Sequence, residues 1–103
     1  MQEVIKEIRK FREERGWIPC RLGDLAKSVS IEAAELLEIF QWINPSKEEA
    51  TSDPIRFPQM KHEIADVMIY CLEMCDDLGL DPVILIREKM AHNATRYPSK
   101  GSV

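Results

Sequence analysis

Two long segments of the chain contain no helix-breaking residue, and they constrain the fold more than any other feature. The first covers about residues 25–43 and stops at Pro45, and the second covers residues 58–78 and stops before Gly79. Proline and glycine mark the points at which helices commonly begin and end. No segment alternates polar and apolar residues for long enough to predict a β-strand. The fold class is therefore predicted to be all-α.

A further helix is expected toward each end of the chain. Apolar residues recur at intervals of three and four within residues 4–11, which predicts an amphipathic helix that ends at Gly16. Asp81 followed by Pro82 is typical of a helix N-cap and first helical residue. The last helix is therefore expected over about residues 82–95.

Polar residues between the helices predict how two of the helices begin. Asp24 precedes the segment 25–43 and is expected to cap it with a side-chain oxygen. Ser46 and Glu49 have the spacing of a capping box, which predicts one short helical turn within the polar connection 46–57.

The two long helices are apolar on more than one face, which predicts association between copies of the chain. The 103 residues are enough for about one domain, and a solitary four-helix unit cannot cover these faces. The prediction is therefore a single domain over residues 1–103, a four-helix bundle completed by oligomerisation as a homodimer or homotetramer.

Composition and charge disfavour several classes of protein. Fourteen Lys and Arg residues against eighteen Asp and Glu residues give a net charge of −4, so the chain lacks the cationic surface that nucleic-acid binding needs. The longest apolar run, residues 67–72, is far shorter than the ~20 residues of a membrane-spanning helix. The three cysteines are interpreted as reduced thiols in the core of a cytoplasmic protein.

Each long helix carries a pair of acidic residues three positions apart. The pairs are Glu32 with Glu35, and Glu63 with Asp66. At this spacing both side chains leave one side of a helix about one turn apart. Mostly apolar residues surround both pairs, and the axes of packed helices are only ~8–10 Å apart. We therefore expect the four carboxylates to converge.

A convergence of carboxylates predicts a bound cation. Two like charges 4 Å apart repel by about 4 kcal/mol at an effective dielectric constant of 20. Ligand sets made only of oxygen suit Mg²⁺, Mn²⁺ or Ca²⁺ rather than zinc, and Mg²⁺, for which Mn²⁺ can substitute, often shares its coordination with phosphate oxygens. The pattern indicates a phosphate-bearing substrate. In the alternative interpretation the chain is a non-catalytic helical module whose acids bind a structural cation or a basic protein partner.

Other residues suit the remaining parts of such a substrate. Phosphate oxygens could be contacted from the last helix, and a planar base could stack on tryptophan. The alternatives are a solvated helix end and tryptophans that fill space under a loop. The candidate substrate-binding residues are Trp17, Trp42, Lys89, Asn93, Arg96 and Tyr97.

A degenerate zinc-protease motif, His62-Glu63-x-x-Asp66, is a weak alternative because it lacks the second histidine.

Together these residues resemble the MazG-like nucleoside triphosphate pyrophosphohydrolases of the all-α NTP pyrophosphatase superfamily, in particular the dCTP-pyrophosphatase-like branch. The resemblance covers almost the whole chain. It rests on the two acidic pairs, the EIFQW motif that ends at Trp42, the DLGLD turn, Lys89, Asn93, and the RYP motif at residues 96–98.

The resemblance implies hydrolysis of a nucleoside triphosphate, often a non-standard or surplus deoxynucleotide, to the monophosphate and pyrophosphate. It implies Mg²⁺ bound by Glu32, Glu35, Glu63 and Asp66, phosphate contacts from Lys89, Asn93, Arg96 and Tyr97, and a base pocket lined by Trp17 and Trp42. Glu35 or Glu38 is expected to orient the attacking water. Cys20, Ile31 and Ala34 depart from the common pattern, and the departure at Cys20 affects the segment expected to set base selectivity.

Overall fold

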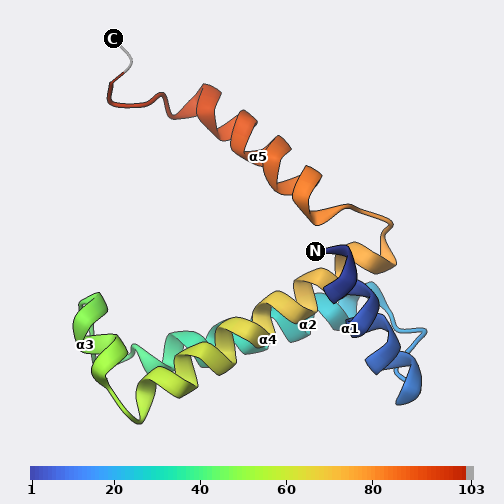
Figure 1. The fold of residues 1–103 in the computed structure, drawn as a ribbon, viewed down its shortest axis with the longest axis horizontal. Helices are drawn as coiled ribbons and strands as arrows, with labels where there is room; N and C mark the ends of the chain where they lie inside the picture. The colour runs from blue at the N-terminus through green and yellow to red at the C-terminus, as the bar shows by residue number, and fades with distance from the viewer. Residues whose placement is uncertain (102–103) are drawn as a thin grey trace.

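The computed structural model describes residues 1–101, which form five α-helices joined by short connections (Figure 1). The helices are α1 (Gln2–Glu14), α2 (Leu22–Ile39), α3 (Lys47–Ser52), α4 (Arg56–Asp77) and α5 (Pro82–Arg96). No β-strand occurs within the described residues, so the predicted all-α fold class is confirmed. None of the helices in this part of the chain is both long enough and apolar enough to cross a bilayer.

The helix pair α2 and α4 forms the body of the molecule. These two helices lie side by side over most of their lengths, α1 packs against α4, and the short α3 packs against α4 as well (Figure 1). The helix α5 projects away from this body (Figure 1). The two helices that carry the acidic pairs are therefore direct neighbours.

The N-terminus of α2 differs from the prediction. The helix begins at Leu22 with Arg21 as its N-cap, so the expected capping by Asp24 is wrong. Gly23 and Asp24 lie in the first turn, where backbone amides have no partner within the helix and glycine is easily accommodated. The negative charge of Asp24 in this turn favours the helix dipole.

The C-terminus of α2 also differs from the prediction, because the helix ends at Ile39 rather than near Ile43. The amide of Phe40 donates to the carbonyl of Leu37 over 3.0 Å, a bond across three residues that closes the last turn. Trp42 therefore lies in the connection after the helix, with 87% of its surface exposed.

The other turn and cap predictions agree with the structure. Gly16 follows α1 with a φ of +68°, the left-handed conformation that glycine adopts most easily. The capping box is present, because the Glu49 amide donates to Ser46 Oγ over 3.2 Å and the Ser46 amide donates to Glu49 Oε1 over 3.3 Å. Asp81 Oδ1 accepts the amides of the first turn of α5.

The helix α4 begins at Arg56, two residues before the predicted start at Pro58. Asp53 Oδ1 accepts the amide of Ile55 over 3.0 Å and the amide of Arg56 over 2.8 Å. These bonds satisfy amides that the start of the helix leaves free, so the helix extends toward Asp53.

The interior of a single chain is small. Its buried hydrophobic side chains within residues 1–101 are Ile5, Leu25 and Met60. The radius of gyration is 16.9 Å, whereas a compact domain of about 100 residues has a radius near 13 Å. The three cysteines are free thiols, but Cys71 is exposed and Cys20 and Cys75 are half-buried, so the prediction that the thiols lie in the core is wrong for the single chain.

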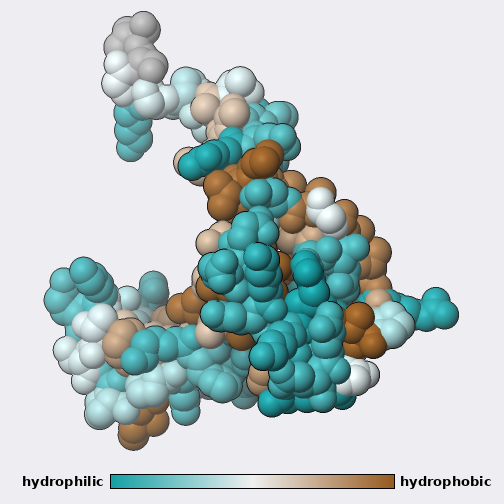
Figure 2. Space-filling model, turned by 45° about the vertical axis from the view of Figure 1, so that its right-hand side comes forward, coloured by the Kyte–Doolittle hydropathy of each residue, from teal (hydrophilic) through white to brown (hydrophobic). Residues whose placement is uncertain are grey.

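The projecting helix α5 leaves much of its apolar surface uncovered. Ile84, Ile86 and Met90 are 55%, 54% and 64% exposed, and Figure 2 shows hydrophobic surface on the arm that α5 forms. Within the described residues α5 makes no extended packing contact with another helix. A single chain therefore does not close into a four-helix bundle.

Candidate functional site

The predicted acidic residues meet in the interface between α2 and α4. Glu32, Glu35 and Glu63 each offer one carboxylate oxygen, and these three atoms all lie within 4.8 Å of one another. Glu63 also belongs to a second such group with His62 and Asp66, in which His62 Nε2 is 3.4 Å from Asp66 Oδ2. The structure thus brings three predicted ligands directly together and joins Asp66 to them through Glu63. We call these four acids the acidic cluster.

The electrostatics of the acidic cluster favour a bound cation. The Oε2 atoms of Glu32 and Glu63 are buried and have no hydrogen-bond partner among the described residues. The neighbouring Glu63 carboxyl group, followed by loss of hydration and the nearby Glu35 carboxylate, raises the pKa of Glu32 to about 7. Unpartnered buried carboxylate oxygens are unfavourable. A hard divalent cation fits this all-oxygen set and would satisfy both atoms.

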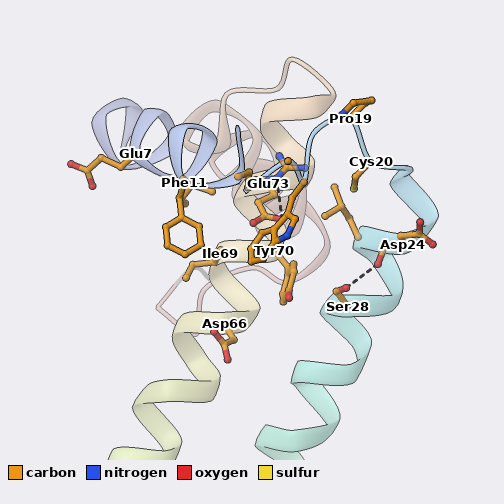
Figure 3. A pocket seen from close by; sticks show the side chains of 15 residues that line it. Glu7, Phe11, Pro19, Cys20, Asp24, Ser28, Asp66, Ile69, Tyr70 and Glu73 are labelled. Carbon is orange, nitrogen blue, oxygen red and sulfur yellow. Dashed lines mark hydrogen bonds and ion pairs between the residues drawn. The ribbon is translucent and has the colours of Figure 1, made fainter. Parts of the chain in front are cut away.

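An apolar cavity of about 740 Å³ lies between α1, the start of α2 and α4 (Figure 3). Phe11, Trp17 and Tyr70 line it, and the rings of Phe11 and Trp17 meet edge to face with centroids 5.9 Å apart. Burial raises the pKa of the Tyr70 hydroxyl. Asp66 lies at one end of this aromatic cavity, which therefore borders the acidic cluster (Figure 3).

A second cavity, of about 510 Å³, borders the acidic cluster from another direction. It lies between the end of α2 and the start of α4 and is lined by Glu35, Glu38, Ile39, Trp42, Ile43, Arg56, Gln59 and Glu63. We call it the polar cavity. Trp17 and Trp42 therefore line different cavities, and a single chain does not bring them into one base pocket.

The four predicted phosphate-binding residues of α5 lie apart from both cavities. Neither lining includes Lys89, Asn93, Arg96 or Tyr97, and α5 projects from the body (Figure 1). The Arg96 guanidinium lies over the Tyr97 ring, 5.3 Å from its centroid. A contact of these residues with phosphate remains a prediction, and it requires α5 to meet an acidic cluster that it does not reach within one chain.

Several cavity residues escaped the sequence interpretation although helical spacing points to them. Ser28 is four positions before Glu32, and Tyr70 is four positions after Asp66. Gln59 is four positions before Glu63 and three after Arg56. Residues three and four apart share a helix face. The acidic pairs therefore mark faces whose other members line the cavities, and extending each face by one turn would have found them.

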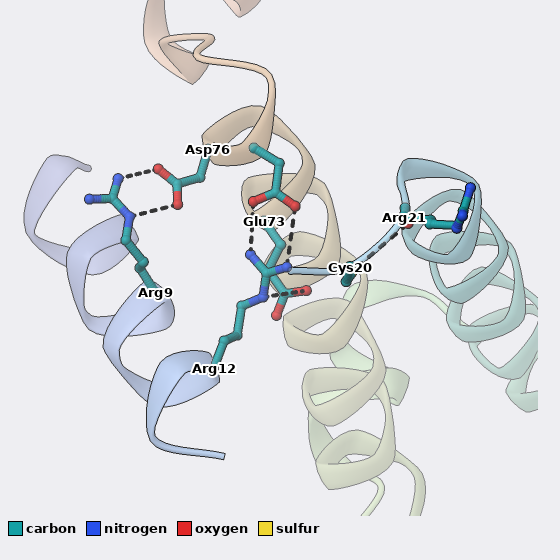
Figure 4. A network of polar contacts seen from close by, with 7 residues as sticks. Arg9, Arg12, Cys20, Arg21, Glu73 and Asp76 are labelled. Carbon is teal, nitrogen blue, oxygen red and sulfur yellow. Dashed lines mark hydrogen bonds and ion pairs between the residues drawn. The ribbon is translucent and has the colours of Figure 1, made fainter. Parts of the chain in front are cut away.

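Ion pairs attach α1 to the last turns of α4 (Figure 4). Arg9 donates from Nε to Asp76 Oδ2 over 2.8 Å, and its Nη2 pairs with Asp76 Oδ1. Arg12 donates from Nη1 and Nη2 to the two carboxylate oxygens of Asp77, each over 3.2 Å, and its Nε lies 3.6 Å from Glu73 Oε2. The sequence gives one sign of these ion pairs, which is that a charged residue, Arg12, lies on the apolar face of α1.

Comparisons with known proteins agree with this geometry. The sequence model described as the MazG-like family matches residues 27–102. A crystal structure of a pyrophosphatase from Archaeoglobus fulgidus is similar to this chain, with 43% sequence identity and a TM-score of 0.84 over 96% of this chain and 93% of that one. No curated protein sequence matches significantly. Because the family match spans well over half of the chain, the protein belongs to the MazG-like family.

Proposed function

We propose that the protein hydrolyses a (deoxy)nucleoside triphosphate to the nucleoside monophosphate and pyrophosphate, as a house-cleaning enzyme of the nucleotide pool. The observation that carries the proposal is the convergence of Glu32, Glu35 and Glu63 within 4.8 Å, with buried carboxylate oxygens for which residues 1–101 supply no donor. The similarity to a pyrophosphatase supports the same reaction class.

Magnesium is the cofactor that best fits the acidic cluster. Glu32, Glu35, Glu63 and Asp66 would hold it, with Mn²⁺ as a substitute, because all four offer the hard oxygen ligands that these ions prefer. Bound there, Mg²⁺ would supply positive charge that neutralises phosphate oxygens as the α–β anhydride is broken.

The chain's own residues account for substrate binding and proton transfer. The aromatic cavity would take the base, and the polar cavity would accommodate phosphate beside Arg56. A water oxygen attacks the α-phosphorus, the bond to the bridging oxygen breaks, and pyrophosphate leaves. Glu38 lines the polar cavity beside Glu35 but belongs to neither acidic group. We therefore assign the water's proton to a Glu38 carboxylate oxygen, while Glu35 orients the water.

The site is proposed to be completed by a second copy of the chain, in a homodimer or homotetramer. The exposed apolar residues of α5 support this assembly. In it, α5 would present Lys89, Asn93, Arg96 and Tyr97 to the phosphates. Trp42, which is 87% exposed in the single chain, would be covered at the same time.

A panel of canonical, deaminated and methylated nucleoside triphosphates, assayed with Mg²⁺ for release of pyrophosphate, tests the function. We expect pyrophosphate and monophosphate in equal amounts and no release when the metal is chelated. Glu35→Gln should abolish release while circular dichroism shows an unchanged helix content. Full turnover by Glu35→Gln would refute the proposal.

Thermal melting separates this enzyme from a non-catalytic module that binds a structural cation or a basic protein. A nucleotide site should gain more stability from Mg²⁺ together with a non-hydrolysable triphosphate than from Mg²⁺ alone, because a ligand stabilises only the state that binds it. An equal melting temperature under both conditions would favour the non-catalytic module.

A further inference from the structure

We infer that Arg12 is a positioning residue that sets the place of Trp17 in the wall of the aromatic cavity and thereby controls affinity for the base of the substrate. The inference rests on the proposed function, because it assigns the aromatic cavity to the base. It concerns a residue that touches neither the acidic cluster nor the reacting atoms.

The side chain of Arg12 fixes the C-terminal part of α1 to α4. It is 2% exposed, the most deeply buried charged side chain described. Both terminal nitrogens donate to Asp77 at 3.2 Å, and Nε faces Glu73 Oε2 at 3.6 Å. A planar guanidinium held by carboxylates on two sides has little freedom to turn or slide. Arg12 therefore fixes the position of this part of α1 on α4.

The backbone of the same residue holds the turn that carries Trp17. The carbonyl oxygen of Arg12 accepts the amide of Trp17 over 3.0 Å and the amide of Arg15 over 3.2 Å. Gly16, with its φ of +68°, allows the chain to reverse between them. The backbone of Trp17 is therefore hydrogen-bonded directly to Arg12, whose side chain is anchored on α4.

The buried ion pairs of Arg12 are better explained by the position that they fix than by a gain in folding stability. Burial raises the pKa of Glu73, even though the neighbouring Arg12 acts in the opposite direction. Burying charges in this way is commonly no more stabilising than packing apolar side chains of similar size. Arg9 already pairs with Asp76 one turn earlier, at the exposed edge of the same helix contact. What Arg12 adds is a defined position in the cavity wall, which it lines together with Trp17.

The location of Trp17 determines which kinetic constant should change. Trp17 and Phe11 lie at the α1 side of the aromatic cavity, whereas Asp66 lies at the end that borders the acidic cluster. Displacement of Trp17 removes contact with the base and leaves the carboxylates in place. Loss of a contact made equally in the ground state and the transition state raises KM and leaves kcat unchanged.

The test compares Arg12→Gln with Arg9→Gln, which removes a pair on the same two helices outside the cavity lining. We expect Arg12→Gln to raise KM for the preferred triphosphate by about tenfold, the scale of one lost stacking contact, with kcat within about twofold of the parent. Arg12→Lys should recover part of the affinity, and Arg9→Gln should leave both constants unchanged. If Arg12→Gln does not fold, Asp77→Asn is measured in its place, with the same rise in KM expected.

Fluorescence provides a readout that does not depend on turnover. The α,β-methylene analogues of dCTP, dTTP, dATP and dGTP are titrated with Mg²⁺, and the signal from Trp17 is the part lost in Trp17→Phe. We expect at least one analogue to change this signal, and Arg12→Gln to weaken its binding by about tenfold. If the parent protein binds an analogue but releases no pyrophosphate from any hydrolysable triphosphate of the panel, the proposed function is refuted but the positioning role is not. Equal effects of Arg12→Gln and Arg9→Gln, a fall in kcat alone, or no Trp17 signal with any analogue would overturn the positioning role.

Discussion

Glu63 belongs to both acidic groups, and its Oε2 atom is buried without a hydrogen-bond partner in the described part of the chain. We predict that Glu63→Gln lowers kcat by at least about 100-fold, because the amide cannot replace a negatively charged ligand and metal charge stabilisation is worth several kcal/mol. The assay is Mg²⁺-dependent pyrophosphate release. Glu48→Gln, the same change at an exposed position of α3, is the matched control and should behave as the parent protein. A fully active Glu63→Gln would remove this residue from the metal site.

Asp76 supplies a pH dependence of stability. A hydrogen bond and the charge of Arg9 lower the pKa of Asp76 below its usual value. The folded state therefore favours the ionised form, and this stabilisation is present at neutral pH and is lost as the pH falls through the folded pKa. We predict that Asp76→Asn reduces the loss of unfolding free energy between pH 6 and pH 3, as measured by urea denaturation. Arg9→Gln should reduce it in the same way, and an unchanged pH profile in both variants would contradict the assignment.

Individual residues were predictable where helical spacing reports directly on a face. Glu32, Glu35 and Glu63 were placed together correctly because side chains three apart leave one side of a helix and the two helices pack side by side. The pairing of Arg12 with Asp77 was not predictable in the same way. It joins residues 65 positions apart, and their contact depends on how α1 crosses α4 rather than on local spacing.

At the scale of elements, the helices were predictable but their ends were less so. Proline and glycine located the long helices because they act through the backbone itself. The start of α2 was misplaced because Asp24 suits both the N-cap and the first turn, and only the surrounding hydrogen bonds decide between them. No proline or glycine stands at the end of α2, so the sequence does not predict that the helix ends at Ile39.

The N-cap of α5 contributes to the stability of this helix in a way that can be measured directly. Asp81 Oδ1 accepts the amide of Val83 over 2.9 Å and that of Ile84 over 3.3 Å. We predict that Asp81→Ala destabilises the helix by about 1 kcal/mol, the usual scale for a lost N-cap. Because α5 has no extended packing on the other helices of residues 1–101, amide hydrogen exchange in α5 should accelerate more than in α4. Asp81→Asn keeps a capping oxygen and should show little change, whereas equal acceleration in both helices would contradict a local effect.

At the scale of the whole molecule, the sparse interior and the projecting α5 predict self-association. Analytical ultracentrifugation at micromolar concentration should show a dimer or tetramer. Ile86→Glu and Met90→Glu place charge on the exposed apolar surface of α5 and should shift the distribution toward monomer. Glu88→Lys, an exposed charge change on the same helix, should leave it unchanged. A monomeric parent protein at this concentration would contradict the prediction.

The all-α class could be predicted for the whole molecule, but the arrangement of its helices could not. Periodicity shows that a helix has an apolar face without showing which surface covers that face. The sequence therefore predicts a bundle completed by oligomerisation without showing which helix is left open, and in the single chain it is the apolar residues of α5 that remain exposed. The resemblance implies that Trp17 and Trp42 line a base pocket completed by a second copy of the chain, and within one chain they line separate cavities.

The projection of α5 has a consequence for the proposed enzyme, because it would tie catalytic output to the amount of protein present. If Lys89 and Arg96 reach phosphate only across a subunit boundary, an isolated chain keeps its acidic residues yet lacks these two positive charges at the substrate. Turnover per chain would then fall steeply on dilution and recover on concentration. At low expression the protein would then be mostly monomeric and inactive, and a modest rise in expression would increase the active fraction.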